Sequence, residues 1–336
     1  MNNVLITGGA GFIGSNLVNF LVEKHKSWNF FVLDKLTYSG NKKNIANALK
    51  SDKCFFIEGD IKNQKLIEKL VAENNINIIL HLAAESHVDR SIEDPLEFAY
   101  TNVLGTLTLL NTVKKFWANQ PNHLFYHIST DEVYGSLGEK GFFKEDTRYD
   151  PRSPYSASKA SSDHFVRAFG ETYNLKYVIS NCSNNYGPFQ HPEKLIPLVI
   201  SKILKQESIP VYGNGSNIRD WLYVMDHVTA IDNILNSGKH NVTYNIGGNN
   251  EVRNIDMVKK IIHFVDIRMG NQPGHSEALI RFVKDRKGHD YRYAIDNSKL
   301  TKELNWTPAV GIDKGLDMTI YWYLSNTEWI EEMIKK

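Results

Sequence analysis

A tyrosine and a lysine four positions apart, Tyr155 and Lys159, have types and spacing that suit proton transfer. On a helix, residues i and i+4 share a face, so the phenol and the ammonium group would be neighbours. A lysine cation beside a phenol favours the phenolate and would lower the pKa of Tyr155 from about 10 toward neutrality. Such a phenolate can take a proton from a hydroxyl group while the carbon beneath it gives up a hydride. The pair therefore predicts alcohol oxidation, with an ordinary surface pair on a helix as the alternative.

The residues before Tyr155 favour a helix at this point of the chain. Ser153 and Pro154 form a natural N-cap and first-turn pair. The same spacing recurs at positions 38 and 42, but a glycine and an asparagine between them predict a loop. We therefore expect the helical pair at 155 and 159 alone.

A threonine and two acidic residues, Thr130, Asp131 and Glu132, follow an apolar run at 124–128. In open α/β sheets the carboxyl ends of strands line the ligand crevice, so these side chains would face a substrate. One carboxyl group can protonate a leaving hydroxyl while the other removes a carbon-bound proton. The sequence favours an acid–base pair for an elimination. A solvated turn or a helix cap is the alternative.

A glycine-rich turn lies between the first apolar run, at 3–7, and a helical pattern at 12–23. Gly8, Gly11 and Gly14 give the spacing at which the chain turns tightly, approaches a pyrophosphate and packs helix against strand. The phosphates would lie on the free N–H groups of the helix start. The turn predicts a bound dinucleotide, and a glycine-rich turn without a ligand is the alternative.

An aspartate at the end of the second apolar run indicates which dinucleotide binds. Asp34 lies about 20 residues beyond Gly14, where a carboxylate accepts hydrogen bonds from the adenine ribose and repels a 2′-phosphate. NAD is therefore favoured over NADP. Asp60 and Ile61 are placed to meet the adenine, although Asp60 could instead cap the following helix. Three nearby lysines could weaken the preference for NAD: Lys35, Lys42 and Lys43.

The elements that must position these residues alternate between strand and helix. Strands are expected at 3–7, 30–34, 54–58, 76–81, 124–128 and 177–181, and helices at 12–23, 64–73, 97–117 and 154–173. This alternation predicts an α/β fold with a doubly wound, Rossmann-type parallel sheet. We expect residues 1–182 to form an NAD-binding domain, completed by a strand near 242–246. Residues 183–336 would form a smaller α/β substrate-binding domain.

Composition narrows the class of protein. The chain has 336 residues, 42% of them hydrophobic, and a net charge of +1, which gives no electrostatic case for nucleic acid or an anionic membrane. No apolar run is long enough to span a membrane. Its two cysteines, Cys54 and Cys182, suggest neither a disulfide framework nor a zinc site, and histidine spacing gives no metal site. We expect a cytoplasmic protein without metal.

Together these residues resemble the extended short-chain dehydrogenase/reductase family, in its nucleotide-sugar 4,6-dehydratase branch, and most closely the dTDP-glucose 4,6-dehydratases. The resemblance runs over almost the whole chain. The segments that carry it are TGGAGFIGS (7–15), DKLTYSGN (34–41), LAAESHVDRS (82–91), STDEVYG (129–135), SPYSASKA (153–160), NCSNNYGP (181–188), PEKLIP (192–197), VYGNG (211–215), IRDWLYV (218–224), YNIGG (244–248) and DRKGHDYRYAID (285–296).

The resemblance implies a hydro-lyase that turns dTDP-glucose into the 4-keto-6-deoxy sugar and water, with NAD regenerated in each turnover. Tyr155 would take the C4 hydroxyl proton, with Thr130 on the C4 oxygen, as a hydride passes to NAD. Glu132 would remove the C5 proton and Asp131 would protonate the leaving C6 hydroxyl, before the hydride returns to C6. Cofactor contacts are expected from Gly8, Gly11, Phe12, Ile13, Gly14, Asp34, Lys35, Thr37, Gly40, Asp60, Ile61, Leu82, Ala83, Ala84, Tyr155 and Lys159.

The resemblance also implies which residues hold the nucleotide sugar. Arg219 and Arg286 suit a diphosphate, since a guanidinium pairs with phosphate oxygens at two points, although each could pair with its neighbour Asp220 or Asp285. Tyr212 would stack on a pyrimidine, with a core tyrosine as the alternative. The full expected set is Ser86, Asn184, Lys194, Leu195, Pro210, Tyr212, Arg219, Asn254, Arg286 and His289.

The family implies a homodimer packed through the helices at 97–117 and 154–173. Longer members carry an aromatic segment after Trp322 and Tyr323, and contacts from it are expected to be absent or replaced here. The alternatives in function are a nucleotide-sugar 4-epimerase, a UDP-glucose 4,6-dehydratase, a reductase that releases its nicotinamide, and an NAD-binding redox sensor. The acidic pair weighs against the epimerase, and retention of Tyr155 with Lys159 weighs against the sensor.

Overall fold

A computed structural model describes residues 2–118 and 121–336. Within these ranges seven strands form one sheet in the order β10-β6-β5-β4-β1-β2-β3, and every neighbouring pair is parallel. The strands of this sheet are β1 (Asn3–Thr7), β2 (Asn29–Asp34), β3 (Cys54–Glu58), β4 (Ile78–His81), β5 (Leu124–Thr130), β6 (Tyr177–Cys182) and β10 (Val242–Ile246). The prediction of a doubly wound α/β fold is confirmed.

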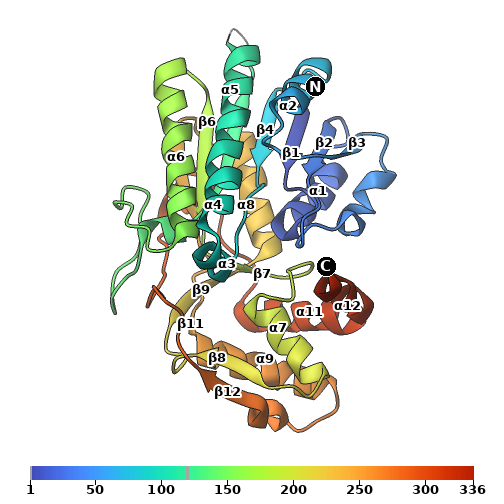
Figure 1. Ribbon diagram of the computed structural model, residues 1–336, viewed down its shortest axis with the longest axis vertical. Coiled ribbons are helices and arrows are strands. Elements are labelled where there is room, and N and C mark those ends of the chain that lie inside the picture. Colours follow the sequence, from blue (N-terminus) through green and yellow to red (C-terminus); the bar gives the residue numbers. More distant parts are fainter. Residues whose placement is uncertain (1, 119–120) are drawn as a thin grey trace.

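Helices cover both faces of this sheet, as Figure 1 shows. α1 (Phe12–Lys24) and α8 (Val224–Ser237) pack on one face. α2 (Gln64–Glu73), α5 (Gly105–Trp117) and α6 (Pro154–Tyr173) pack on the other. Strands buried on both faces must be apolar throughout, which explains the unbroken runs of hydrophobic residues in the sequence.

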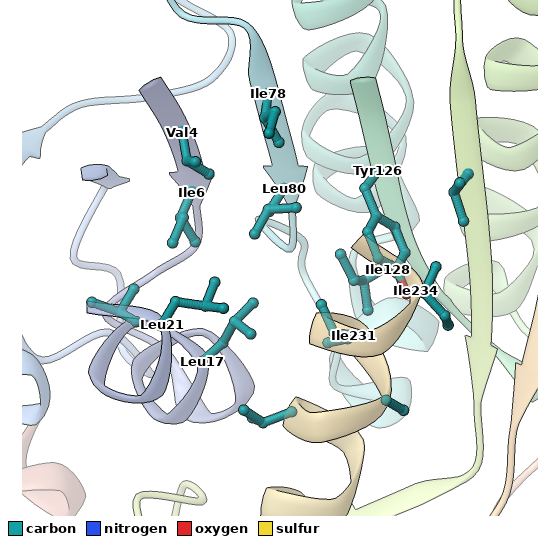
Figure 2. Close-up of a cluster of buried hydrophobic side chains, with 14 of the residues drawn as sticks. Val4, Ile6, Leu17, Leu21, Ile78, Leu80, Tyr126, Ile128, Ile231 and Ile234 are labelled. Atoms are coloured by element: carbon teal, nitrogen blue, oxygen red, sulfur yellow. The ribbon is translucent and has the colours of Figure 1, made fainter. Parts of the chain in front are cut away.

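The first core layer joins distant parts of the chain, as the close-up in Figure 2 shows. Ile6 of β1, Leu17 of α1 and Ile231 of α8 are each fully buried there. Burial of such a side chain contributes about 1.5–3 kcal/mol. The layer fixes α1 and the ends of the central strands, and with them the glycine turn. α8 and β10 thus belong to this sheet unit although they come late in the chain.

A smaller unit lies beyond the carboxyl ends of the main sheet, in the lower half of Figure 1. It contains a three-stranded sheet of β11 (Glu251–Arg253), β9 (Ile218–Tyr223) and β7 (Asn184–Tyr186), and a parallel pair of β12 (Ile280–Val283) and β8 (Ile209–Tyr212). Its helices are α7 (Leu195–Leu204), α9 (Asn254–Arg268), α11 (Ile312–Ser325) and α12 (Thr327–Lys335). These elements share a hydrophobic core of their own.

Shorter elements complete the chain. They are α3 (Val88–Glu93), α4 (Pro95–Phe98) and α10 (Ser298–Leu304), with short 3-10 helices at Lys42–Ile45, Ala48–Lys50, Asp131–Tyr134 and His275–Leu279. In the described ranges no helix is long and apolar enough to cross a membrane.

The single helix expected at 97–117 is interrupted. Between α4 and α5 the chain forms a π-helical segment, Ala99–Leu104. The buried Asn102 within it bonds the backbone N–H and C=O of Glu85 and the hydroxyl of Ser158. The wider turn thus places the Asn102 side-chain amide where it links the loop after β4 to α6. Such π-helical segments are frequent at functional sites.

Candidate active site

A cavity of about 310 Å³ opens at the carboxyl ends of the central strands. Every residue expected to contact the cofactor lines it, and so do Thr130, Asp131, Glu132, Ser86, Asn184 and Lys194. Parallel strands end at the same edge of a sheet, which is why residues scattered over the sequence meet here.

The glycine turn forms a cradle at one end of this cavity. Gly8 has a φ of +70°, and a Cβ on Gly14 would lie 2.1 Å from the Gly8 carbonyl oxygen, so both positions require glycine. A Cβ on Gly11 would meet only the Gly8 oxygen, at 3.4 Å. Gly11 is also the N-cap of α1 and provides no side-chain cap for the first N–H groups. The cradle therefore fits a pyrophosphate.

Asp34 lies where β2 ends, beside this cradle. Its Oδ2 accepts a hydrogen bond from Ala10 N at 2.9 Å and its Oδ1 accepts one from Leu36 N at 2.8 Å. Burial raises the pKa of Asp34, and the backbone N–H groups and the Lys336 charge partly offset that rise. The carboxylate thus braces the turn and also presents negative charge at the ribose end of the cavity, as NAD requires.

The other charged residues near this end contact groups of the protein itself. Asp60 lies 3.0 Å from the Lys35 ammonium and accepts from Lys62 N, while α2 is capped by Asn63. The alternative in which Asp60 caps that helix is therefore excluded. Lys42 lies over the Phe56 ring and Lys43 pairs with Glu332, so neither is committed to a 2′-phosphate.

Thr130, Asp131 and Glu132 form the end of β5 and the start of a 3-10 turn. Asp131 is 2% exposed, so the solvated-turn alternative is wrong. The Thr130 hydroxyl accepts from Glu132 N at 3.3 Å and lies 3.4 Å from Asp131 Oδ1. The hydroxyl thereby caps the turn and holds the two carboxyl groups beside it.

The two carboxyl groups have different electrostatic surroundings. Burial, and then the Glu132 and Asp220 charges, raise the pKa of Asp131 well above its ordinary value. Burial also raises the pKa of Glu132, but the charges of Arg219, Lys194 and Arg286 oppose the rise. The pKa of Asp131 is thus raised further than that of Glu132, so Glu132 ionises before Asp131 as the pH rises.

Tyr155 and Lys159 come from the first turns of α6. Ser153 and Ser156 form a capping box there and Pro154 occupies the first turn, as the sequence predicted for the helix start. Both functional side chains line the cavity. The Lys159 ammonium donates to the Ile128 carbonyl at 2.9 Å.

The pKa of Tyr155 differs from the sequence-based expectation. Burial, followed by the Glu132 charge, raises the pKa of Tyr155 well above its ordinary value, while a hydrogen bond with Thr130 acts in the opposite direction. Burial likewise lowers the pKa of Lys159. Shared helix spacing alone did not reveal either the low polarity of the site or the acidic neighbour.

A second cavity, also about 310 Å³, adjoins the first and shares Ser86, Glu132, Asn184 and Lys194 with it. All the residues expected to hold the nucleotide sugar line this second cavity: Ser86, Asn184, Lys194, Leu195, Pro210, Tyr212, Arg219, Asn254, Arg286 and His289. The buried Asn184 Oδ1 has no hydrogen-bond partner among the described residues. The sheet unit and the smaller unit thus enclose one continuous site.

The two arginines have partners other than their sequence neighbours. Arg286 pairs with Asp89, at 2.6 Å, rather than with Asp285. Arg219 donates to the backbone carbonyls of Ile218, Asp290 and Tyr291 and to no carboxylate among the described residues. The Arg219 charge is therefore not cancelled by an ion pair, which suits an anionic ligand.

The neighbours Asp220 and Asp285 have other contacts. Asp220 accepts from Gly248 N and Asn250 N, and Asp285 accepts from His289 Nδ1 at 2.7 Å. Tyr212 is 40% exposed, so it is not a core tyrosine. Its ring lies 5.2 Å from the Arg286 guanidinium at the cavity mouth.

Several residues of the site were not assigned a role from sequence. Glu193 lines both cavities and lies 3.4 Å from Arg90 and 3.7 Å from His87. Thr101 lines the first cavity, and Asp89 the second. Glu193 and Asp89 stand in segments that carry the family resemblance, but nothing in their spacing indicated ligand contact. Within residues 2–118 and 121–336, no cluster of His, Cys, Asp and Glu side chains is arranged to hold a metal.

Comparisons with known proteins identify the family of the chain. Residues 5–319 match the family model described as GDP-mannose 4,6 dehydratase. The chain is 49% identical to a dTDP-glucose 4,6-dehydratase of Xanthomonas campestris pv. campestris (strain B100), over 98% of this chain and 95% of that one. It is 45% identical to an Escherichia coli dTDP-glucose 4,6-dehydratase, over 98% of this chain and 96% of that one.

Solved structures give the same result. The chain is similar to the Bacillus anthracis dTDP-glucose 4,6-dehydratase in complex with NAD, at 42% identity and a TM-score of 0.89. The match covers 99% of this chain and 100% of that one. It is also similar to a Thermotoga maritima UDP-glucose 4-epimerase with UDP-glucose, at only 27% identity and a TM-score of 0.85. That match covers 97% of this chain and 99% of the epimerase. On the family match and these full-length relatives, the chain belongs to the GDP-mannose 4,6 dehydratase family, and its resemblance to the nucleotide-sugar 4,6-dehydratases is confirmed.

Proposed function

We propose that this protein is a hydro-lyase that converts dTDP-glucose to dTDP-4-keto-6-deoxyglucose and water, with NAD as a resident cofactor. One observation carries the proposal: an acidic pair of unlike surroundings, Asp131 and Glu132, lines the same cavity as Tyr155 and the glycine cradle. The relatives named dTDP-glucose 4,6-dehydratase support the substrate.

Tyr155 and Thr130 act on the C4 hydroxyl group of the sugar. Thr130 holds the C4 oxygen, and Tyr155 takes its proton, helped by the Lys159 ammonium on the same face of α6. When bound, NAD supplies a positively charged nicotinamide ring and a reversible acceptor for the hydride that leaves C4 and returns to C6. The buried site keeps water away from the reacting carbons.

Glu132 and Asp131 carry out the elimination. The carbonyl at C4 acidifies the C5 proton, which Glu132 removes while Asp131 gives its proton to the leaving C6 hydroxyl, so that water departs. A proton is returned to C5 when the hydride returns to C6, which completes the 4-keto-6-deoxy sugar. The three cations near Glu132 favour its ionised form, and burial beside a second carboxyl group keeps Asp131 protonated. These different surroundings support Asp131 as the proton donor and Glu132 as the proton acceptor.

The second cavity holds the nucleotide diphosphate in this proposal. Arg219, Arg286 and Lys194 bind the phosphates, and Tyr212 at the mouth stacks on the pyrimidine. Ser86 and Asn184, at the junction of the two cavities, position the sugar. The remaining contacts come from Leu195, Pro210, Asn254 and His289. The chain thus divides into an NAD-binding part and a nucleotide-sugar-binding part, with α8 and β10 in the first.

We also infer a homodimer in the cytoplasm. Several exposed apolar side chains lie on α4, the π-helical segment and α6, namely Leu96, Tyr100, Leu104, Phe165 and Tyr173. Exposed apolar side chains on these elements are suited to contact with a second copy of the chain. Cys54 and Cys182 are buried free thiols, as in reducing compartments.

The deciding experiment incubates the purified protein with dTDP-glucose and follows the product by mass spectrometry. Loss of one water is expected. In heavy water the product should carry deuterium at C5, and a C4-deuterated substrate should deliver its label to C6. An epimerised product of unchanged mass would instead establish the 4-epimerase, a fold neighbour at 27% identity.

Two further alternatives are separated by the same assay. A side-by-side comparison of dTDP- and UDP-glucose decides between the nucleotides, which a pocket distinguishes by about 1–3 kcal/mol for one methyl group. If the deuterium from the C4-labelled substrate appears in free NADH, the protein is a reductase that releases its nicotinamide. Bound NAD without turnover of any hexose would indicate a redox sensor.

A further inference from the structure

Tyr38, in the loop after β2, has no role in the proposed chemistry. It stands between Thr37 and Ser39, which both line the first cavity. The guanidinium group of Arg90 on α3 lies over the Tyr38 ring, with its central carbon 3.6 Å from the ring centre. A planar guanidinium at this distance is attracted to the face of a phenol ring. The contact therefore joins the loop after β2 to α3.

Two residues of a third segment complete a ring of contacts. Arg90 Nη2 lies 3.4 Å from Glu193 Oε2, and Glu193 N donates to His191 Nδ1 at 3.3 Å. The His191 ring meets the Tyr38 ring edge-on, with 5.1 Å between the ring centres. We call these four residues, Tyr38, Arg90, Glu193 and His191, the clasp. Its contacts run in a closed circuit through three segments that are far apart in the sequence.

The three segments that the clasp joins all contribute to the wall of the first cavity. Two of them belong to the sheet unit, and the third leads into α7 of the smaller unit. The residues of these segments that line the cavity include Thr37, Ser39, Glu85, Ser86, His191 and Glu193. The clasp therefore fastens the two units to each other beside the cavity that would hold NAD.

We propose that the clasp holds the cofactor cavity closed, so that the Arg90 contacts must break before NAD can enter or leave. The inference rests on the proposed function, in which NAD stays bound from one turnover to the next. The hydride taken from C4 must return to C6 of the same sugar, so loss of the cofactor between these steps would abort the reaction. A contact that slows cofactor release serves this requirement.

Arg90 can be replaced without altering the wall of the cavity. The two members of the clasp from the third segment line the cavity themselves, whereas Arg90 lines neither cavity. The loop that carries Tyr38 is also anchored by α12, where Trp329 Nε1 donates to Asn44 Oδ1 at 2.8 Å. Loss of the Arg90 side chain should therefore open the clasp and leave the loop folded.

The test is Arg90→Met in the holoenzyme, because methionine keeps a long apolar side chain and removes the guanidinium group. Protein loaded with isotopically labelled NAD is mixed with excess unlabelled NAD, and the bound label is followed by mass spectrometry. Release should be about tenfold faster than from the parent protein, as expected for loss of one cation–π contact and one partly exposed ion pair. No nucleotide sugar is added, so the result does not depend on the substrate.

The rate of NAD uptake distinguishes a clasp from an ordinary binding contact. A barrier to exit is also a barrier to entry, so full-length Arg90→Met stripped of NAD should take up the cofactor faster than the stripped parent protein. Faster release with unchanged uptake would show that Arg90 only strengthens binding, which overturns the inference. Unchanged release overturns it as well.

Arg268→Met is the matched control for this variant. Arg268 also lies over a tyrosine ring, that of Tyr321 at 5.1 Å, and pairs with Asp317 at 2.7 Å, but it lines neither cavity. Its release of NAD should match that of the parent protein. Equal acceleration in both variants would mean that the effect is not specific to the clasp, and would overturn the inference.

A second variant decides the matter if Arg90→Met does not fold. Tyr38→Leu removes the ring that lies between Arg90 and His191, and both rates should again rise. Unchanged release from a folded Tyr38→Leu overturns the inference. So does a parent protein that exchanges its NAD within the time of mixing, even if it converts dTDP-glucose. The expected rate changes without turnover of dTDP-glucose would count against the proposed substrate and not against the clasp.

Discussion

Arg286 and Asp89, which are 197 positions apart in the sequence, form a two-point ion pair. Arg286 Nε lies 2.6 Å from Asp89 Oδ1, and Nη2 donates to Oδ2 at 2.8 Å. Asp89 stands on α3, whose Arg90 lies 3.4 Å from Glu193, a residue on the wall of both cavities. The arginine proposed to bind diphosphate is therefore oriented by an element that also contacts Glu193, on the wall of the cofactor cavity.

Arg286→Lys should weaken substrate binding with little change in the chemical step. A lysine keeps the charge but cannot contact Asp89 and a phosphate through a planar fork. Loss of one charged hydrogen bond costs about 1.5–3 kcal/mol, so KM should rise roughly 10- to 150-fold while kcat is nearly unchanged. Steady-state kinetics with dTDP-glucose measures both constants.

Arg281→Lys is the matched control for this variant. Arg281 lies on β12 and its Nη1 donates to the carbonyl groups of Ala278 and Ile280, away from either cavity. Its KM should equal that of the parent protein. An equal rise in KM for both variants would show that Arg286 has no special place in phosphate binding.

Glu132→Gln should separate oxidation from elimination. The amide cannot take the C5 proton, but Tyr155 and Thr130 are left in place to oxidise C4. Addition of dTDP-glucose should therefore produce the absorbance of bound reduced nicotinamide without loss of water, with turnover reduced about 10²- to 10⁴-fold. Glu303→Gln is the control. It changes a carboxylate that pairs with Lys239 and lines neither cavity, so this variant should behave as the parent protein. Unimpaired turnover in Glu132→Gln would remove the residue from its role.

The pH dependence of turnover should have an alkaline limb set by Asp131. Burial and the neighbouring carboxylates raise the pKa of Asp131, so its acidic form persists to higher pH than that of an ordinary aspartate and is lost as the pH rises through the raised pKa. The proton for the C6 hydroxyl is lost over the same range. In Asp131→Asn the rate should be low and this limb should disappear. A limb of unchanged position in that variant would assign it to another group.

The fold and the composition of the site were largely predictable from sequence, whereas its electrostatics were not. Gly8, Asp34, Tyr155 and the acidic pair follow strand ends, and strand ends converge, so their meeting follows from the sheet alone. The pKa of Tyr155 depends on burial and on Glu132, which no spacing within one helix reveals. The ion pairs with adjacent aspartates, which were the alternatives for Arg219 and Arg286, are likewise not formed.

Long-range contacts account for these differences. Arg286 pairs across 197 positions and not with the adjacent Asp285, and Asp60 pairs with Lys35 instead of capping α2. The π-helical break near Asn102 arises from bonds to Glu85 and Ser158, on other elements. Local propensity carries no information about such tertiary contacts.

Asp34→Asn should relax the preference for NAD and weaken the turn. Removal of the charge ends the repulsion of a 2′-phosphate, and the amide nitrogen leaves either Ala10 N or Leu36 N without an acceptor. The unpaired group should lower the free energy of unfolding by about 1–3 kcal/mol. After incubation with equal NAD and NADP, the cofactor released on denaturation should contain measurable NADP. Asp52→Asn, at an exposed position, should release NAD alone.

Gly14→Ala should test the glycine cradle independently of any substrate. The added Cβ would lie 2.1 Å from the Gly8 carbonyl oxygen and 2.8 Å from the Gly9 Cα, and backbone atoms cannot move aside as a flexible side chain can. Overpacking of this kind costs about 1–3 kcal/mol, so the melting temperature should fall and the purified protein should retain less NAD. Gly138→Ala is the matched control, because no described atom beyond Gly138 and its two chain neighbours lies within 4 Å of the added Cβ. A Gly14→Ala protein that melts with the parent and keeps its full cofactor would mean that α1 can shift away from the turn, and that this position does not require glycine.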